Sequence, residues 1–310
     1  MSKRVLLAGA TGVIGRELVP MLRGRGHRVT ALVRDPSRAA GLAVDDIVVA
    51  DALDAPAVRS AVLSARPQVV VHQLTALRVS TGEGMETTAR LRIEGTTNLV
   101  RAAVRAGARR IVAQSIAFAT APRGGGVLTE DAPLFFDAPD PGWSRTVRAV
   151  AELEHTVLGT HDITGLVLRY GSLYGPGTLY HPDGAIGAAV GRGRFPLPES
   201  AAGVTSFLHV ADAASAAVAA VESEIGGVFN VSDDEPAEAA TWVPAYARML
   251  GAPPPRTVPV MLIERMSGWL TGYQLTAMRG AANGYAKRVL GWRPRTPSWR
   301  TGLEVASLGP

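Results

Sequence analysis

Three glycines spaced three residues apart form the most informative pattern in the chain. Gly9, Gly12 and Gly15 follow the apolar segment 5–8 and open an amphipathic segment. Where a strand turns into a helix over such glycines, backbone N–H groups at the helix N-terminus stay free. The helix macrodipole favours an anion there, such as a pyrophosphate. The residues expected to form this cradle are Gly9, Thr11, Gly12, Val13, Ile14 and Gly15.

Each glycine has its own expected task in that cradle. Gly9 would make the tight turn, Gly12 would let the backbone approach the pyrophosphate, and Gly15 would let the helix pack closely on the strand. An ordinary glycine-rich turn is the alternative interpretation. The strand before the glycines and the helix after them favour a dinucleotide site.

Two arginines follow the next apolar segment, where a dinucleotide-binding fold contacts the adenosine ribose. Arg34 and Arg38 flank the pair Asp35-Pro36. A planar, forked guanidinium suits a 2′-phosphate, whereas a carboxylate at the end of this strand would suit a 2′-hydroxyl. Asp35 precedes a proline, and we expect it to open a helix instead. The pattern favours NADP(H) as the cofactor; the alternative is that both arginines line a solvated turn.

Apolar segments alternate with amphipathic segments through the first half of the chain. Short apolar strands separated by helices are typical of a parallel sheet covered on both faces, with its ligand crevice at the strand carboxyl ends. We therefore predict an α/β fold, a Rossmann-type doubly wound parallel sheet with a smaller C-terminal substrate-binding lobe. The expected strands are 4–8, 28–33, 47–49, 69–72, 110–114 and 165–170, and the expected helices are 12–25, 36–42, 55–65, 84–106 and 143–158.

The predicted division of the chain places the dinucleotide-binding core in residues 1–170 and most of the substrate-binding lobe in residues 171–310. Two later apolar segments, 204–210 and 227–231, are predicted to return to the core as strands. The lobe carries methionine and aromatic residues at roughly helical spacing, which either pack a core or form an apolar lid over a large, flat substrate. They are Met261, Met266, Trp269, Leu270, Tyr273 and Met278.

The composition excludes several classes of site and partner. The 310 residues include no cysteine, which rules out disulfides, thiolate nucleophiles and zinc–sulfur sites, and we expect no metal centre. The formal net charge is +5, but the arginines are spread along the chain, so we expect no nucleic-acid partner. No apolar stretch reaches membrane-spanning length. These features predict a cytoplasmic protein, monomeric or homodimeric, with no membrane partner.

The order and spacing of the motifs resemble the extended short-chain dehydrogenase/reductase family, which includes nucleotide-sugar epimerases and dehydratases. The glycine pattern matches its fingerprint, and residues 168–177 match its strand and nicotinamide-side loop. Segments 207–212, 228–231 and 291–294 match later parts of the family, so the likeness spans nearly the whole chain. The resemblance implies further cofactor contacts from Asp51, Ala52, Gln73, Leu74, Thr75, Arg148, Tyr170, Gly171 and Leu173.

The resemblance also implies a catalytic centre, from which this chain departs. The family uses a serine or threonine after the fifth strand, which Ser115 matches, and a Tyr-x-x-x-Lys pair on the next helix. With Glu152 as the helix's reference glutamate, Ser144 takes the tyrosine position and Arg148 the lysine position. With Glu154 instead, the two positions hold Thr146 and Val150.

Neither alignment restores the usual acid, because no tyrosine occurs between residues 1 and 169. An arginine keeps its proton at neutral pH, and a serine is too weak an acid to protonate an alkoxide unaided. Losing a positioned general acid costs roughly 10²–10⁴ in rate. Replacement donors in the loop that faces the nicotinamide are Tyr170, Tyr174, Tyr180 and His181.

These features lead us to expect an NADPH-dependent ketoreductase acting on a phenolic, polycyclic ketone whose own phenol supplies the proton. The chain is similar to atypical ketoreductases of aromatic-polyketide antibiotic biosynthesis, of the angucyclinone type that includes simocyclinone. Two alternatives stay open: a redox-neutral isomerase, cyclase or dehydratase with bound NADP, and a non-catalytic protein that senses NADP(H). The expected substrate is a hydrophobic aromatic small molecule.

Overall fold

The computed structural model describes residues 2–76 and 82–307. Its centre is a seven-stranded sheet in the order β11-β6-β5-β4-β1-β2-β3, and all its neighbouring strands are parallel. The predicted doubly wound fold is confirmed. The strands are β1 (Arg4–Ala8), β2 (Arg28–Val33), β3 (Asp46–Val49), β4 (Val69–His72), β5 (Arg110–Ile116), β6 (Thr164–Tyr170) and β11 (Gly227–Val231).

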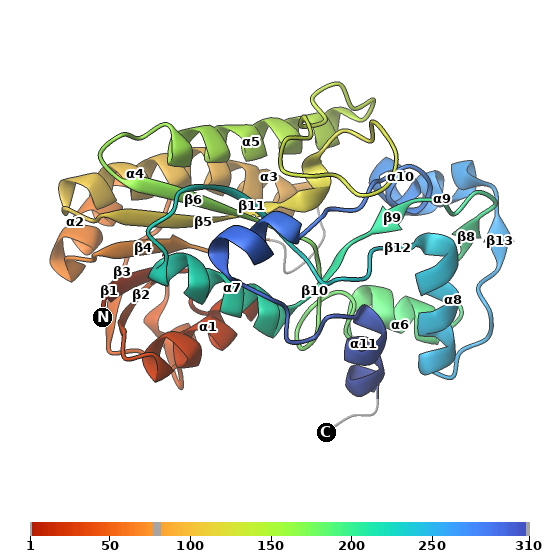
Figure 1. The fold of residues 1–310 in the computed structure, drawn as a ribbon, viewed down its shortest axis with the longest axis horizontal. Coiled ribbons are helices and arrows are strands. Elements are labelled where there is room, and N and C mark those ends of the chain that lie inside the picture. The colour runs from red at the N-terminus through yellow and green to blue at the C-terminus, as the bar shows by residue number, and fades with distance from the viewer. Residues whose placement is uncertain (1, 77–81, 308–310) are drawn as a thin grey trace.

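Helices cover both faces of this sheet (Figure 1). Side chains alternate between the faces along each strand, so Val5 and Leu7 pack with α1 and α7, whereas Leu6 and Ala8 pack with α2, α4 and α5. Both faces are apolar, which explains the continuous hydrophobic runs in the sequence. The covering helices are α1 (Val13–Gly24), α2 (Ala55–Ala65), α3 (Gly82–Arg90), α4 (Thr96–Arg105), α5 (Pro141–Leu158) and α7 (Val210–Glu222).

The strand order reverses between β1 and β4, which lie side by side at the middle of the sheet. From β1 the chain adds β2 and then β3 toward one edge of the sheet. It then returns past β1 and adds β4 on the other side of β1. In open α/β sheets, ligands bind outside the strand carboxyl ends at such a switch point. The glycine turn and the residues after His72 both lie there.

Three predicted elements differ from the structure. The helix expected over 36–42 is a short 3₁₀ helix, Pro36–Ala39. The single helix expected over 84–106 is two helices, α3 and α4, joined by a π-helical turn at Leu91–Gly95. The strand expected over 204–210 does not join the main sheet. It divides at Ser206, whose side chain exchanges two hydrogen bonds with the backbone of Ala281, so its halves pair elsewhere. The halves are β9 (Val204–Thr205), which pairs with β12 (Ala237–Glu238), and β10 (Phe207–His209), which pairs with β7 (Ser172–Tyr174).

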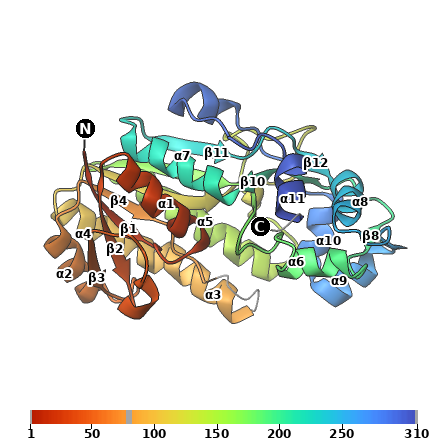
Figure 2. The same cartoon turned by 90° about the horizontal axis from the view of Figure 1, so that it is seen from below.

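The C-terminal part of the chain forms a smaller lobe beside the carboxyl ends of the strands (Figures 1 and 2). It has a hydrophobic core of its own, with Trp242, Tyr246 and Trp299 fully buried against Phe207. Met261 and Met266 of the lobe, by contrast, are exposed to solvent. The lobe elements are α6 (Ala185–Gly191), β8 (Leu197–Pro198), α8 (Ala239–Met249), β13 (Thr257–Val258), α9 (Val260–Ser267), α10 (Trp269–Thr276), a π-helical turn (Ala286–Leu290) and α11 (Trp299–Ser307).

Candidate active site

The glycine turn between β1 and α1 has a backbone that only glycine fits. Gly9 has φ +101°, and a Cβ on it would lie 2.7 Å from the carbonyl oxygen of Gln73. A Cβ on Gly15 would lie 2.2 Å from the carbonyl oxygen of Gly9. Gly9 therefore makes the tight turn and Gly15 allows the close helix–strand contact, as the spacing predicts.

The N-terminus of α1 fits an anionic group. Gly12 is the N-cap, no side chain caps the helix, and its first turn carries no acidic residue. The first-turn N–H groups of a helix lack intrahelical partners, and here Val13 and Ile14 supply them. Nearby, the Oε1 atom of Gln73 is buried without a hydrogen-bond partner among the described residues. A bound dinucleotide would supply partners for these uncapped N–H groups and for the Gln73 amide oxygen, which lie together at the carboxyl ends of β1 and β4.

Arg34 and Arg38 are both exposed after β2, Arg34 before the short 3₁₀ helix Pro36–Ala39 and Arg38 within it. Within the part of the chain that the structure describes, neither guanidinium makes a hydrogen bond or an ion pair. Asp35 instead turns toward Ser37 and accepts hydrogen bonds from its N–H (2.9 Å) and its hydroxyl (2.7 Å). These bonds lower the pKa of Asp35. Asp35 thus opens the helix as predicted, the positive charge of Arg38 lowers its pKa further, and both guanidinium groups remain exposed after β2.

The other predicted cofactor contacts line the same edge of the sheet. Asp51 is exposed and accepts a hydrogen bond from the Leu53 N–H (2.9 Å), and Ala52 is buried beside it. Gln73 donates from Nε2 to the Tyr170 hydroxyl (3.2 Å), so the ends of β4 and β6 are joined directly. Leu74 and Thr75 follow, half-buried and exposed. Gly171 and Leu173 continue from β6 into β7.

Ser115 belongs to a buried polar cluster between the sheet and α5. Its hydroxyl donates to Oε1 of Glu154 (2.8 Å), and the serine is only 1% exposed. Arg169 donates to both carboxylate oxygens of Glu154 (2.8 and 2.7 Å). Arg92 is buried nearby, and burial lowers its pKa to about 10 while Glu154 opposes that shift. In this arrangement, the Ser115 hydroxyl is engaged with a carboxylate.

The two alignments of α5 correspond to different faces of the helix. Glu154 is buried against β5 and β6, and the residues four and eight positions before it, Val150 and Thr146, are buried and half-buried. Glu152 is exposed, as is Arg148 four positions before it. Since residues four apart share a helix face, Val150 and Thr146 lie on the same side of α5 as the buried Glu154, whereas Arg148 lies on the exposed side with Glu152.

The surroundings of Val150 are apolar. It packs in one cluster with Trp143 and Val147 of α5 and with Ile116 and Phe118, which follow Ser115. The hydroxyl of Ser144 donates to backbone oxygens of Phe136 and Ala138, and that of Thr146 to the Gly142 oxygen. The structure therefore does not bring Ser144 and Arg148 together with Ser115.

The predicted replacement proton donors either pack in the interior or bond to their own loop. Burial raises the pKa of Tyr170, Tyr174 and Tyr180 above the usual value, to about 12 for Tyr180. The Tyr170 hydroxyl lies between Gln73 and the carbonyl oxygen of residue 213. Tyr180 packs edge-on against aromatic rings of the lobe core. His181 turns back on Asp183, with Nδ1 3.3 Å from its N–H.

A narrow cleft with a free volume of only about 10 Å³ lies between the strand carboxyl ends and the lobe. Among the described residues, its lining includes no tyrosine, histidine or carboxylate. Sequence reasoning missed its one charged residue, Arg279, because a lone arginine between apolar residues carries no motif. The lining residues are Ala117, Phe118, Gly171, Ser172, Ser206, Met278, Arg279 and Ala281.

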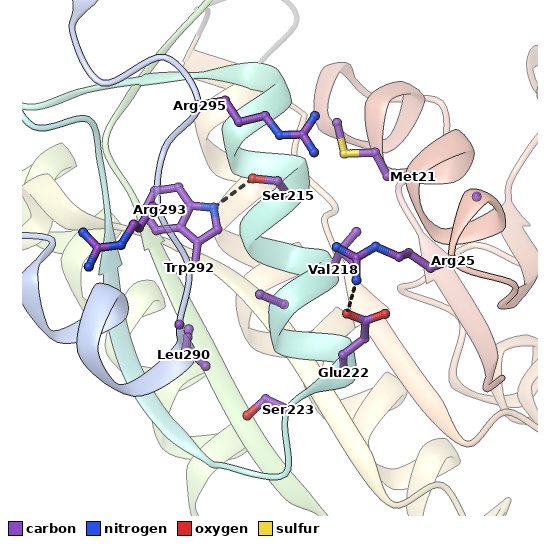
Figure 3. A pocket seen from close by; sticks show the side chains of 13 residues that line it. Met21, Arg25, Ser215, Val218, Glu222, Ser223, Leu290, Trp292, Arg293 and Arg295 are labelled. Carbon is purple, nitrogen blue, oxygen red and sulfur yellow. Dashed lines mark hydrogen bonds and ion pairs between the residues drawn. The ribbon is translucent and has the colours of Figure 1, made fainter. Parts of the chain in front are cut away.

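A larger cavity, of about 600 Å³, lies away from the glycine turn, between the C-terminal ends of α1 and α7 and the segment 290–295 (Figure 3). Two contacts cross it. Arg25 pairs with Glu222 at 3.1 Å, and the Trp292 indole N–H donates to Ser215 at 2.8 Å. This cavity is remote from every predicted catalytic residue.

In the part of the chain that the structure describes, none of the helices combines the length and the apolar character that a membrane span requires. The same residues contain no group of three or more histidines, aspartates or glutamates arranged to hold a metal ion.

Solved structures resemble this fold over nearly its full length. An NAD- and UDP-bound enzyme of Bordetella bronchiseptica, WbmG, matches with a TM-score of 0.77 at 19% identity and covers 99% of this chain and 93% of its own. The dTDP-glucose 4,6-dehydratase DesIV of Streptomyces venezuelae, with NAD bound, matches with a TM-score of 0.76 at 21% identity and covers 99% and 96%. At these identities the likeness shows the fold.

Sequence comparison is more specific. A 3-diazoavenalumate denitrifying reductase of a Streptomyces species is 64% identical over 303 residues, which are 97% of this chain and 99% of that protein. The model of the NAD dependent epimerase/dehydratase family matches residues 5–232. With the glycine turn, the switch-point crevice and this match together, the chain belongs to the NAD dependent epimerase/dehydratase family, the extended short-chain dehydrogenases/reductases.

Proposed function

We propose that the protein is an NADPH-dependent reductase whose acceptor needs no proton from the enzyme. The observation that carries this proposal is that Val150, which takes the lysine position when Glu154 is the reference glutamate, lies in an apolar cluster, while the tyrosine position of that alignment holds Thr146. A bound reduced nicotinamide supplies a hydride. The chain's own residues would hold that cofactor at the glycine turn and present the acceptor in the cleft.

The charge of the acceptor decides whether a protein acid is required. A ketone that gains a hydride becomes an alkoxide, and a general acid must protonate it. An aromatic diazonium that gains a hydride becomes a neutral aryldiazene, which loses N₂ and leaves a C–H bond where the nitrogen was attached. In the second reaction, the hydride supplies the whole of the added hydrogen, so no side chain has to give up a proton.

The diazo reaction is the one we propose for this chain. The 64% identical reductase is named for denitrifying a diazo compound that is also a carboxylate. The protein's contribution would be positioning and exclusion of water, which lower a barrier by several kcal/mol without acid catalysis. We propose an aromatic diazo carboxylate as the acceptor and N₂ as a product.

A phenolic, polycyclic ketone is the second candidate. It is favoured by the aromatic side chains near the cleft, since Tyr273 stacks on Trp269 at 5.0 Å and lies 5.5 Å from Phe135. A phenol beside the carbonyl would supply the proton that the protein lacks. Such a substrate would connect the protein with aromatic-polyketide biosynthesis.

One panel of substrates separates the two candidates. NADPH oxidation is followed at 340 nm with 3-diazoavenalumate, with a peri-hydroxy polycyclic ketone and with its O-methyl ether, while released N₂ is measured by mass spectrometry. We expect one N₂ per NADPH with the diazo compound and no turnover of the ether. NADPH oxidation with the ketone but not with the diazo compound would contradict the diazo assignment.

We propose NADP(H) rather than NAD(H) from the exposed cations Arg34 and Arg38. Replacing both by alanine is expected to raise KM for NADPH by about 10- to 100-fold, because charge-assisted bonds to the 2′-phosphate are lost, and to leave KM for NADH nearly unchanged. Arg66→Ala, which removes an arginine distant from β2's carboxyl end, is the control. Equal effects on both cofactors would contradict the proposal.

A further inference from the structure

Among the described residues, Arg279 is the one charged side chain that lines the cleft. The arginine is half-buried, and its Nε atom is enclosed without a hydrogen-bond acceptor among those residues. A buried charged donor left unpaired in this way costs free energy unless a ligand satisfies it. Two other buried arginines show the contrast: Arg169 pairs with Glu154, and Arg110 donates to the Ile225 oxygen.

The backbone around Arg279 is fixed from both sides. The carbonyl oxygen of Met278 accepts from the Val204 N–H (2.8 Å), and that of Gly280 accepts from the Leu128 N–H (2.7 Å). A Cβ on Gly280 would lie within 3.0 Å of atoms of three neighbours. The backbone position from which Arg279 reaches the cleft is therefore held on both sides.

A second orphaned donor belongs to Tyr273, on α10. Tyr273 is 5% exposed, and its hydroxyl has no hydrogen-bond partner in the described chain. Burial raises the pKa of Tyr273 to about 12, and the positive charge of Arg279 opposes that rise. Tyr273 does not line the cleft, so Arg279 supplies the unpaired charged donor there. A carboxylate supplies two acceptor oxygens and the missing negative charge.

We propose that Arg279 binds a carboxylate of the substrate and so selects aromatic acids with the reacting group held toward the sheet. The proposal names the substrate class for the reductase proposed above and rests on that function only for the identity of the reacting group. Stacked rings at Trp269 and Tyr273 suit the flat aryl part of such an acid.

Binding without turnover tests the inference. The probes are avenalumate, which lacks the diazo group, and its methyl ester, titrated calorimetrically into the enzyme with NADP⁺ present. We expect the wild type to bind the acid about 100-fold more tightly than the ester, in line with a charge-assisted bidentate contact. Arg279→Met and Arg279→Gln should remove this preference, and Arg279→Lys should keep part of it.

Arg295→Met is the matched control, since Arg295 is exposed and lines the remote cavity in Figure 3. It should bind both probes as the wild type does. Thermal unfolding checks that each variant is folded. If the folded Arg279→Gln variant still prefers the acid, or if the wild type shows no preference, the inference is overturned. If acid binding depends on Arg279 but diazo compounds are not reduced, the proposed reaction fails and the carboxylate site stands.

Discussion

Glu154 accepts three hydrogen bonds, one from Ser115 and two from Arg169, with all three residues buried. A carboxylate in such a place neutralises a buried guanidinium and links β5, β6 and α5. Removing one partner of a buried ion pair leaves an uncompensated charge. The same contacts hold the Ser115 hydroxyl against the carboxylate of Glu154.

Glu154→Gln should therefore lower the free energy of unfolding by about 3–5 kcal/mol, and Ser115→Ala by about 1–3 kcal/mol, both measured by urea denaturation. Glu152→Gln, on the exposed face of the same helix, should change it by less than about 0.5 kcal/mol. The folded Ser115→Ala enzyme should keep kcat within about 10-fold. A loss of about 10³-fold with unchanged stability would instead support the catalytic role that the resemblance implies for Ser115.

The sequence predicted some residues of the site correctly and missed others. Gly9, Gly15 and Asp35 take the geometries expected of them, because the turn at Gly9 and the contacts of Gly15 and Asp35 are set within a few residues along the chain. The close approach of Gln73 to Gly9 is the exception, since it comes from a distant segment. The Glu154–Arg169 pair was not predicted, although an arginine inside an apolar strand is a signal for a buried partner. Arg279 could not be identified, since its neighbours come from distant segments of the chain.

At the scale of elements, the contact between β1 and α1 depends on the missing side chain of Gly15. Gly15→Ala would place a Cβ about 2.2 Å from the Gly9 oxygen, so α1 must move away from the strand. We expect a lower thermal midpoint and NADPH binding weakened by at least about 10-fold, because the helix N-terminus would leave its position.

Gly24→Ala is the control on the same helix, since a Cβ there meets nothing within 4 Å. It should leave binding unchanged and stabilise the helix by up to about 1 kcal/mol. NADPH affinity that is equal in the Gly15→Ala and Gly24→Ala variants, measured by fluorescence titration, would contradict the assigned role of the glycine turn.

Element prediction was most successful where periodicity is local. The strands and helices of the first half follow from apolar runs and amphipathic segments, and the sheet order follows from the crossover rule. The break between α3 and α4 occurs without glycine or proline at its start, so the sequence gives no stop signal. The two- and three-residue strands β9 and β10 depend on pairing partners far away in the chain.

At the scale of the whole molecule, Asp233 connects the sheet to the lobe. It follows β11, its N–H donates to the Phe207 oxygen (2.7 Å), and it is 1% exposed. One carboxylate oxygen accepts from the Glu235 N–H, and the other has no partner among the described residues. Burial raises the pKa of Asp233 to about 8, with backbone hydrogen bonds opposing the rise.

A carboxyl group with a raised pKa in the folded state makes stability fall as pH rises. The unfolded chain loses this proton near pH 4, whereas the folded protein holds it until about pH 8. The free energy of unfolding should therefore decrease across that window and level off above it. The Asp233→Asn variant stays neutral at both pH values. Its gain in the free energy of unfolding over the wild type should therefore be about 1–3 kcal/mol larger at pH 8 than at pH 5.

Urea denaturation at the two pH values measures this difference. Asp131→Asn is the control, because the exposed Asp131 side chain makes no hydrogen bond or ion pair in the described part of the chain, and its effect should be the same at both pH values. A stability difference between Asp233→Asn and the wild type that does not change with pH would show that the carboxyl group is not held neutral in the fold.

The central claim is that hydride transfer proceeds without a proton from the protein, and the single-turnover rate of diazo reduction tests it most directly. From about pH 6 to about pH 8 the rate should be flat, with a solvent deuterium isotope effect near 1, and deuterium from C4-labelled NADPH should appear in the product's new C–H bond. A titrating limb in that range together with a solvent isotope effect of about 2 or more would reveal an acid in the transition state and contradict the account.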